Sequence, residues 1–164
     1  VDVRITAKAE QVEEADKMIA EVEKIARERL GDNIFGVDKD TLEGVTIQLL
    51  AKRNETVAVI GSGTVGRLTG RFSAADVDHK HFCGGKNVPI VESDENMEKL
   101  AQDVAQEFNT TYGLACVVTH TDIRVALWRK GKALNWRRTY TGHPDLAPDW
   151  AVNAALNELR RALM

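Results

Sequence analysis

The run TVAVIGSGTVG at residues 56–66 decides the fold class. Residues 56–60 are almost continuously apolar, which is typical of a strand covered by helices on both faces. The run passes directly into the glycine-rich segment 61–66, and Leu68 marks the start of a following helix. A buried strand that turns sharply into a helix is the basic unit of an α/β protein with a partly parallel sheet.

The remaining hydrophobic periods predict the other elements. Helices are expected at 10–30, 41–52, 93–108 (with Ser93 as its cap) and from Pro148 onward. Strands are expected at 114–118, 123–128 and 133–140, whereas residues 73–92 read as irregular apart from Phe82-Cys83-Gly84-Gly85. The predicted fold class is α/β: a mixed sheet with helices on both faces in a three-layer-like arrangement.

The N-terminal part predicts a small β-α-β piece ahead of this sheet. Residues 1–9 alternate apolar and polar side chains, the period of a half-buried strand, and residues 34–37 form a short apolar run after helix 10–30. About 37 residues are too few for a comfortable domain. We therefore expect 1–37 to be the tail of a small α/β unit and 38–164 to be a separate domain. Because the chain begins at Val1 rather than Met, we expect a piece of a longer protein.

The segment Arg129-Lys130-Gly131-Lys132 predicts a hairpin turn between the last two strands. With Lys130 and Gly131 as the loop, the expected cross-strand pairs are Leu127 with Leu134, Val125 with Trp136 and Arg124 with Arg137. Two arginines directly opposite each other repel, so we expect an acid or a bound anion beside them.

Charge and composition exclude several classes of protein. There are 22 Lys and Arg against 25 Asp and Glu, a net charge of −3, whereas proteins that hold nucleic acid or anionic membranes normally carry a basic surplus. Residues 124–138 are locally basic and contain two tryptophans, but Trp136 falls on the apolar side of the hairpin, so nucleic-acid binding is not favoured.

No apolar stretch is long enough to cross a membrane, and no secretory signal is present. Cys83 and Cys116 are too few for a disulfide framework or a zinc cluster, and the expected compartment is the cytoplasm.

The segment 61–66 matches G-x-G-x-x-G between a strand and a helix, which suits an anion. Glycines let the backbone approach closely, and free N–H groups at a helix start face negative charge. A dinucleotide-binding module using Gly61, Gly63 and Gly66 also requires a second strand that ends in an acid about twenty residues on. No apolar strand leads into the acids of residues 74–85, so we expect no NAD site here.

Ser62 lies where a nucleophile would be exposed among N–H donors. It would still need a base, and no His, Lys or Asp lies close to it in sequence. The alternative is a serine that caps the helix or binds phosphate.

The chain resembles the C-terminal part of the competence/damage-inducible CinA family, a nicotinamide mononucleotide (NMN) amidohydrolase domain that follows a KH-like unit in long members. The resemblance covers nearly the whole length. It rests on RITAKA, ARERLGDNIFG, DKDTLEGVTIQLLAKR, TVAVIGSGTVGRLTGRFS, Phe82-Cys83-Gly84-Gly85, Ser93-Asp94-Glu95 and Tyr140-Thr141-Gly142. The resemblance implies that Ser62 corresponds to the serine of the family signature Ala-Glu-Ser-x-Thr-Gly-Gly, Thr64 to its threonine and Gly66 to its second glycine.

The departures fall on the residues that the family uses for chemistry. The signature glutamate is replaced by Gly61 and the first glycine by Val65. The family's Tyr-Ser-Asn-x-x-Lys segment has no counterpart in KNVPIVE at 86–92, where Lys86 is the sole lysine. The Thr-Gly-Ile-Ala-Gly-Pro loop expected after Val118 is missing, and the family's Gly-Asp-Arg is replaced by 142–144, Gly-His-Pro.

These departures predict a CinA-like domain that is deficient in NMN deamidation and keeps a nucleotide-binding or dimer-forming role. The expected phosphate-binding residues are Gly61, Gly63, Thr64 and Gly66, with no metal and no cofactor. The alternative is an active deamidase built around Ser62, with Lys86 or His120 as a substitute helper. A homodimer is expected from the resemblance and from the apolar helix stripes.

Overall fold

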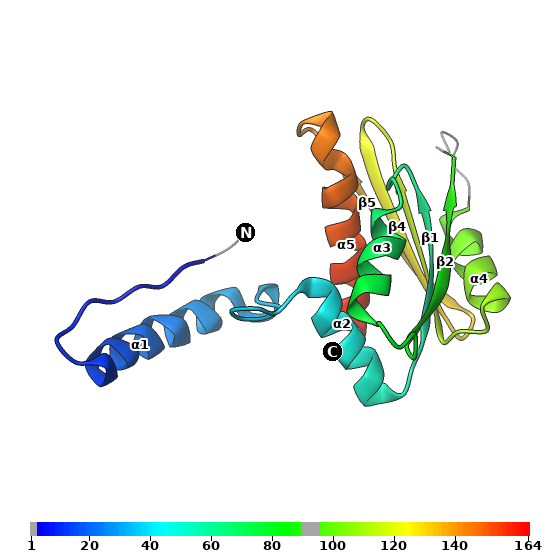
Figure 1. Cartoon of the computed structure of the whole chain (residues 1–164). Helices are drawn as coiled ribbons and strands as arrows, with labels where there is room; N and C mark the ends of the chain where they lie inside the picture. The colour runs from blue at the N-terminus through cyan, green and yellow to red at the C-terminus, as the bar shows by residue number, and fades with distance from the viewer. Residues whose placement is uncertain (1–2, 90–95) are drawn as a thin grey trace. The chain divides into compact units, whose positions relative to one another are not determined.

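The computed structural model describes residues 3–89 and 96–164 (Figure 1). The chain divides into two compact units, residues 1–39 and residues 40–164. The predicted cap Ser93, and the motif Ser93-Asp94-Glu95, lie outside the described residues.

The first unit is built around helix α1 (Val12–Leu30), which ends in the short 3₁₀ turn η1 (Gly31–Asn33). The helix agrees with the prediction for 10–30. The two strands predicted beside it are wrong for the described residues, because 3–9 and 34–37 form no strand. A strand requires a continuous ladder of backbone hydrogen bonds to a neighbouring strand, and residues 3–9 and 34–37 form no such ladder.

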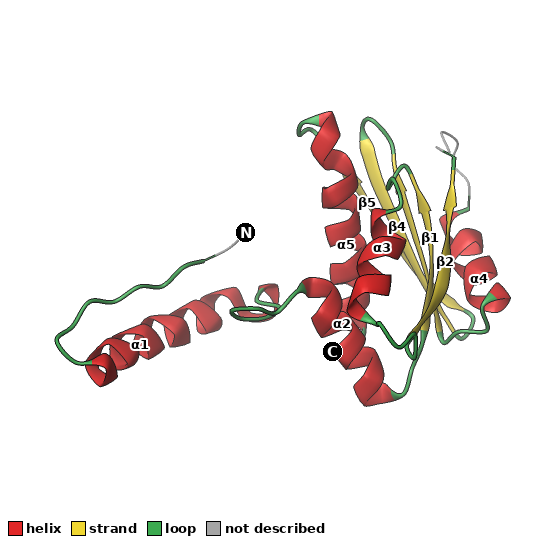
Figure 2. Ribbon diagram, in the orientation of Figure 1, coloured by secondary structure: helices red, strands yellow, loops and turns green. Residues whose placement is uncertain are grey.

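The second unit contains a five-stranded mixed sheet in the order β2-β1-β3-β4-β5 (Figure 2). Its strands are β1 (Val57–Ser62), β2 (Phe82–Val88), β3 (Tyr112–Val118), β4 (Asp122–Arg129) and β5 (Lys132–Thr139). Strands β2, β1 and β3 run parallel, while β4 and β5 continue the sheet in antiparallel fashion. The predicted mixed α/β sheet is therefore confirmed.

Helices cover both faces of this sheet (Figure 1). Helices α2 (Leu42–Arg53), α3 (Arg67–Ala75) and α5 (Ala147–Ala162) pack on one face, and α4 (Met97–Glu107) packs on the other. The 3₁₀ turn η2 (Pro144–Leu146) leads into α5. Both faces of β1 and β3 are buried, which explains the continuous apolar runs in their sequences. Asn96 caps α4 by accepting a hydrogen bond from the Lys99 N–H at 3.1 Å.

Strand β2 corrects the prediction that residues 73–92 are irregular. Its sequence, FCGGKNV, has no apolar alternation because it is a half-exposed edge strand. Only glycine fits at position 85, because a Cβ there would lie 2.7 Å from the carbonyl oxygen of Val59 on the neighbouring strand. The buried carboxylate of Asp76 anchors the start of β2 by accepting hydrogen bonds from the N–H groups of His81 at 2.7 Å and Phe82 at 2.6 Å.

The hairpin register is confirmed for all three predicted pairs, Leu127 with Leu134, Val125 with Trp136 and Arg124 with Arg137. Lys130 and Gly131 both have positive φ, 48° and 78°, as a two-residue hairpin turn requires. The acid expected beside the arginine pair is Asp122, whose carboxylate accepts a hydrogen bond from Arg137 at 2.6 Å.

Candidate functional site

The glycine-rich turn lies at the carboxyl edge of the parallel strands, where α/β proteins usually bind ligands. β1 ends at Ser62, and α3 begins at Arg67. Gly63 has φ +69°, and a Cβ there would lie 2.3 Å from the carbonyl oxygen of Val118 on β3. The turn can therefore pass close to β3 only because residue 63 has no side chain.

The N–H groups of residues 64–66, which lie beyond the β1–β2 ladder, face no acceptor in the part of the chain that the structure describes. Arg67 is the first to be paired, donating to the carbonyl of Thr64 at 3.0 Å. The Thr64 hydroxyl is buried, likewise with no hydrogen-bond partner in that part. It fills the space above Gly61, where a Cβ would lie 2.3 Å from the Thr64 oxygen. Three available N–H groups at the start of a helix, those of residues 64–66, give this turn the chemistry of an anion site.

Ser62 is 1% exposed, and its hydroxyl donates a hydrogen bond to the carbonyl oxygen of Pro89 at 2.8 Å. A carbonyl accepts this hydrogen bond but cannot take up the proton during nucleophilic attack. The serine is thus fixed at the end of β1 by a group that does not activate it.

The two helper residues predicted for Ser62 are engaged or placed elsewhere. The Lys86 ammonium forms an ion pair with Glu107 at the end of α4, and Lys86 sits beside Ile60 in the β1–β2 register, two residues short of Ser62. His120 is exposed in the connection that follows β3.

A dinucleotide-binding module would need a parallel strand after the turn and a carboxylate at the end of that strand. The structure has the strand but not the carboxylate. The β1-α3-β2 unit is parallel, as a Rossmann unit requires, which corrects the expectation that no strand follows the turn. The end of β2 carries Asn87 and Val88 instead of a carboxylate, and the Asn87 amide donates to the Thr69 hydroxyl of α3 at 3.2 Å. The group that would hold the ribose hydroxyls is therefore missing at this position.

Two arginines that were not predicted as site residues share the sheet face of Ser62. Ser62 pairs with Val117 on β3, Val117 with Arg124 on β4, and Arg124 with Arg137 on β5. Register partners point to the same face, here the face covered by α4. Arg124 is only 7% exposed. The hairpin register predicted from the sequence already paired the two arginines. Only the strand order in the structure shows that they lie in one row with Ser62.

Within the described residues, no three or more His, Cys, Asp or Glu side chains are grouped to hold a metal ion. Nor does any helix among them have the length and apolar character needed to span a membrane.

The fold and the turn define a three-layer α/β domain with a candidate anion site at the carboxyl edge of its sheet. Comparison with known proteins agrees on one family. The model of the damage-inducible protein CinA KH domain matches residues 1–36. The chain belongs to the competence/damage-inducible CinA family.

Curated relatives cover different parts of the chain. A putative competence-damage inducible protein of Moorella thermoacetica is 46% identical over 85 residues, 52% of this chain and 20% of that protein. A CinA-like protein of Dictyoglomus thermophilum is 35% identical over 132 residues, 69% of this chain and 32% of the relative. A similar protein of Clostridium botulinum is 29% identical, matching 98% of this chain and 47% of its own length. The chain thus spans less than half the length of these relatives.

Solved structures support the fold. A CinA superfamily protein of Escherichia coli matches with a TM-score of 0.64 at 16% identity, covering 80% of this chain and 98% of its own. One from Klebsiella pneumoniae matches with a TM-score of 0.64 at 15% identity, covering 74% and 95%. At such low identity, this likeness concerns the fold alone.

Proposed function

We propose that residues 38–164 form a CinA C-terminal domain, related to NMN amidohydrolases, that binds a phosphate-bearing nucleotide but is deficient in hydrolysing its amide. The observation that carries this proposal is the hydrogen bond from Ser62 to the Pro89 carbonyl, formed while Lys86 is paired with Glu107. General-base assistance is commonly worth about 10²–10⁴-fold in rate, and Ser62 receives none from the candidate helpers.

Phosphate binding needs no catalytic side chain. The N–H groups of residues 64–66 are backbone groups, held in place by the positive φ of Gly63 and Gly66. An anion at this turn would also face the positive end of the α3 dipole. Binding and chemistry therefore depend on different atoms of the same turn.

The test is a coupled ammonia assay with NMN on the full chain and on Ser62→Ala, after binding of NMN has been measured by calorimetry. We expect saturable binding and the same background ammonia release from both proteins. Turnover above background that disappears in Ser62→Ala would instead establish the active deamidase. Lys86→Met and His120→Gln would then identify its base.

The proposal extends to the organisation of the whole chain. Residues 1–37 are the tail of a KH-like unit, supported by the family match at 1–36 and by the division of the chain after residue 39. The chain forms a homodimer in the cytoplasm. Sedimentation equilibrium should give twice the chain mass of 18.1 kDa, and a species of 18.1 kDa at every concentration would contradict the dimer.

A further inference from the structure

Arg67, the first residue of α3, places a cationic side chain directly after the glycine-rich turn. Its backbone N–H donates to the carbonyl of Thr64, so the main chain of this residue is already part of the turn. In an α-helix each Cα–Cβ bond tilts toward the N-terminal end of the helix. The Arg67 side chain therefore starts in the direction of the N–H groups of residues 64–66, within reach of an anion bound to them.

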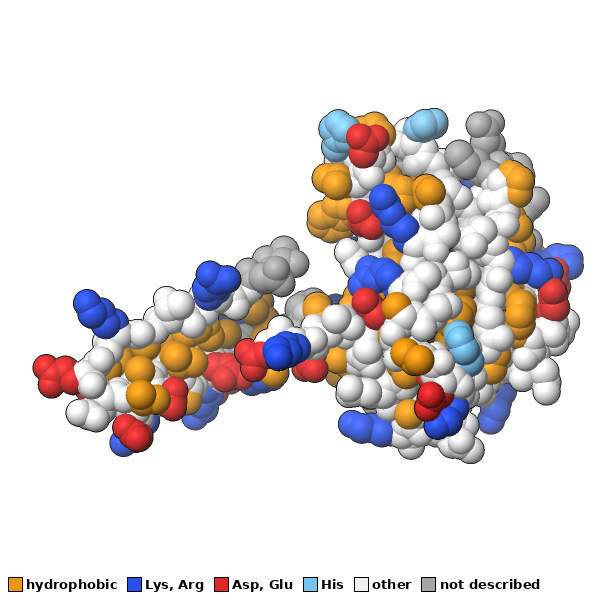
Figure 3. Space-filling view, viewed as in Figure 1, with side chains coloured by type: hydrophobic (Ala, Val, Ile, Leu, Met, Phe, Trp, Pro, Cys, Tyr) orange, Lys and Arg blue, Asp and Glu red, His pale blue; other side chains and the backbone are white. Residues whose placement is uncertain are grey.

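The Arg67 guanidinium forms an ion pair with Asp149 in the first turn of α5, at 3.1 Å. Figure 3 shows basic and acidic side chains next to each other on the surface over α3 and α5. The two side chains are 42% and 52% exposed, so water screens the pair and it contributes little to stability. The guanidinium is thus held by a contact that a stronger anion can replace.

The packing of α3 does not depend on this ion pair. Leu68 and Phe72 are fully buried in the core beneath the helix. Arg71, one turn further along, joins α3 to α2 and α5 by hydrogen bonds. Arg67 can therefore exchange its partner, or be replaced by another residue, while α3 stays in place.

The turn also contains a buried donor that lacks a partner. The Thr64 hydroxyl is 1% exposed, and no described residue forms a hydrogen bond with it. An unpaired buried hydroxyl calls for an explanation such as a bound water or ion. Together with the N–H groups of residues 64–66 and a guanidinium beside the start of a helix, it belongs to a donor set that suits the oxygens of a phosphate.

We propose that Arg67 completes this site and selects ligands that end in a phosphomonoester, and that Asp149 competes with the ligand for the guanidinium. This inference rests on the proposed function and specifies which kind of phosphate the turn takes. A phosphomonoester carries a charge of about −1.5 to −2 at pH 7, whereas a carboxylate carries a single charge. Its oxygens also accept two parallel hydrogen bonds from a guanidinium. The exchange of Asp149 for a phosphomonoester is therefore favourable.

The experiment measures the binding of NMN, a phosphomonoester, and of its methyl phosphodiester by isothermal titration of the full chain. The wild type binds NMN at least about tenfold more tightly than the diester, the effect of one hydrogen bond to a charged group. Arg67→Met lowers the affinity for NMN about tenfold and reduces this preference to about threefold or less. Asp149→Asn raises the affinity for NMN about two- to fivefold, the contribution of an exposed ion pair.

Two control variants remove the same charges elsewhere. Lys80→Met removes an exposed cation that is paired with Asp78 just before β2, at the opposite edge of the sheet from the turn. Asp145→Asn removes an exposed acid four residues before Asp149, one that lies beside His143 instead of Arg67. Both controls keep the affinity and the preference of the wild type.

The double variant Arg67→Met/Asp149→Asn separates competition from simple repulsion. It binds NMN no more tightly than Arg67→Met alone, because Asp149 acts through the guanidinium. A gain that persists without Arg67 overturns the competition, since Asp149 would then merely repel the ligand.

The remaining outcomes separate this inference from the proposed function. Equal affinity of the wild type and Arg67→Met for NMN overturns the role of Arg67 and leaves nucleotide binding intact. Failure of NMN to bind to the wild type overturns both proposals. If the ammonia assay finds turnover, the proposed deficiency in catalysis is wrong, and the same titrations on the Ser62→Ala background still decide the role of Arg67.

Discussion

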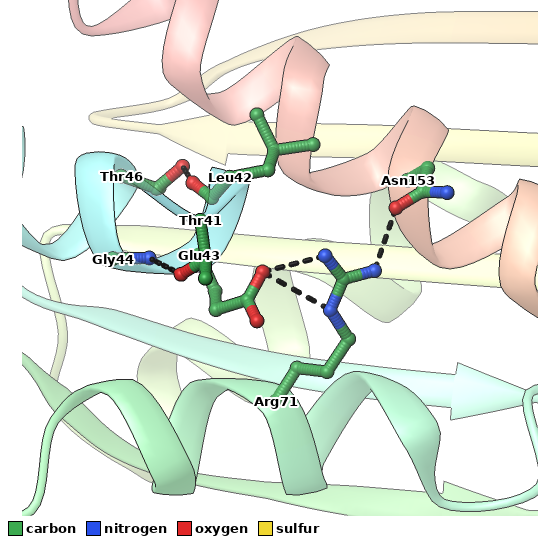
Figure 4. Close-up of polar contacts among 7 residues, drawn as sticks. All are labelled: Thr41, Leu42, Glu43, Gly44, Thr46, Arg71 and Asn153. Atoms are coloured by element: carbon green, nitrogen blue, oxygen red, sulfur yellow. Dashed lines mark hydrogen bonds and ion pairs between the residues drawn. The ribbon is translucent and has the colours of Figure 1, made fainter. Parts of the chain in front are cut away.

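Arg71 joins three helices on one face of the sheet, and its loss should measurably weaken the second unit (Figure 4). Its Nε and one terminal nitrogen donate to the same Glu43 oxygen of α2, at 3.1 and 2.5 Å. The other terminal nitrogen donates to the Asn153 side chain of α5 at 2.6 Å. Thr41 fixes the start of α2 beside this contact by accepting a hydrogen bond from the Gly44 N–H.

The expected strength follows from the burial of the pair. The Arg71 and Glu43 side chains are 29% and 17% exposed, so water screens them less than a surface pair. Hydrogen bonds to charged groups contribute about 1.5–3 kcal/mol, and exposed pairs about 0.2–1 kcal/mol. We therefore expect a coupling free energy of about 1–2 kcal/mol between the two residues.

A double-mutant cycle with Glu43→Gln and Arg71→Met measures this coupling. All three tryptophans lie beyond residue 40, so their fluorescence during urea unfolding follows the second unit alone. The control cycle uses Lys99 and Asp103, a pair on α4 that is 67% and 53% exposed. A coupling between Glu43 and Arg71 no larger than that of the control would refute the reasoning.

Four further outcomes are expected. Burial tends to raise the pKa of Asp76, but the backbone N–H groups at the start of β2 outweigh it and hold this pKa below its ordinary value. The Asp76 carboxylate therefore stabilises the folded state at pH values above the pKa that it has in the unfolded chain, and this stabilisation is lost as the pH falls through its pKa in the folded protein. Asp76→Asn should accordingly lower the free energy of unfolding in urea more at pH 7 than at pH 3. A thiol reagent should label the exposed Cys83 in the native protein and Cys116 only after unfolding, because complete burial raises the pKa of Cys116 to about 12. Gly63→Ala should lower the free energy of unfolding by about 1–3 kcal/mol, since φ is +69° and the new Cβ meets a carbonyl. Micromolar NAD should give no saturable binding, and saturation that Gly63→Val abolishes would contradict this.

The sequence predicts the centre of the fold well because local patterns and burial agree there. Strand β1 is buried on both faces, and its apolar run shows this directly. The hairpin register follows from a two-residue turn, since Lys130 and Gly131 leave one pairing for every residue of the two strands.

The prediction fails where pairing depends on distant residues. Strand β2 has almost no apolar pattern, and it is held by Asp76, by β1 and by the absence of a side chain at Gly85. The row that joins Ser62 to Arg124 requires the order β1-β3-β4, in which β3 follows β1 after a helix, a strand and a second helix. The spacing of residues in the sequence does not predict that strand order.

The same division between local and distant residues separates the proposed binding from the proposed loss of catalysis. The proposed anion would be held by the backbone N–H groups of residues 64–66, which persist as long as Gly63 and Gly66 keep their positive φ. Activation of Ser62 instead needs a basic side chain within hydrogen-bond reach, whereas the Pro89 carbonyl only accepts a hydrogen bond from the hydroxyl. Substitutions in the surrounding loops can remove such a base without disturbing the turn.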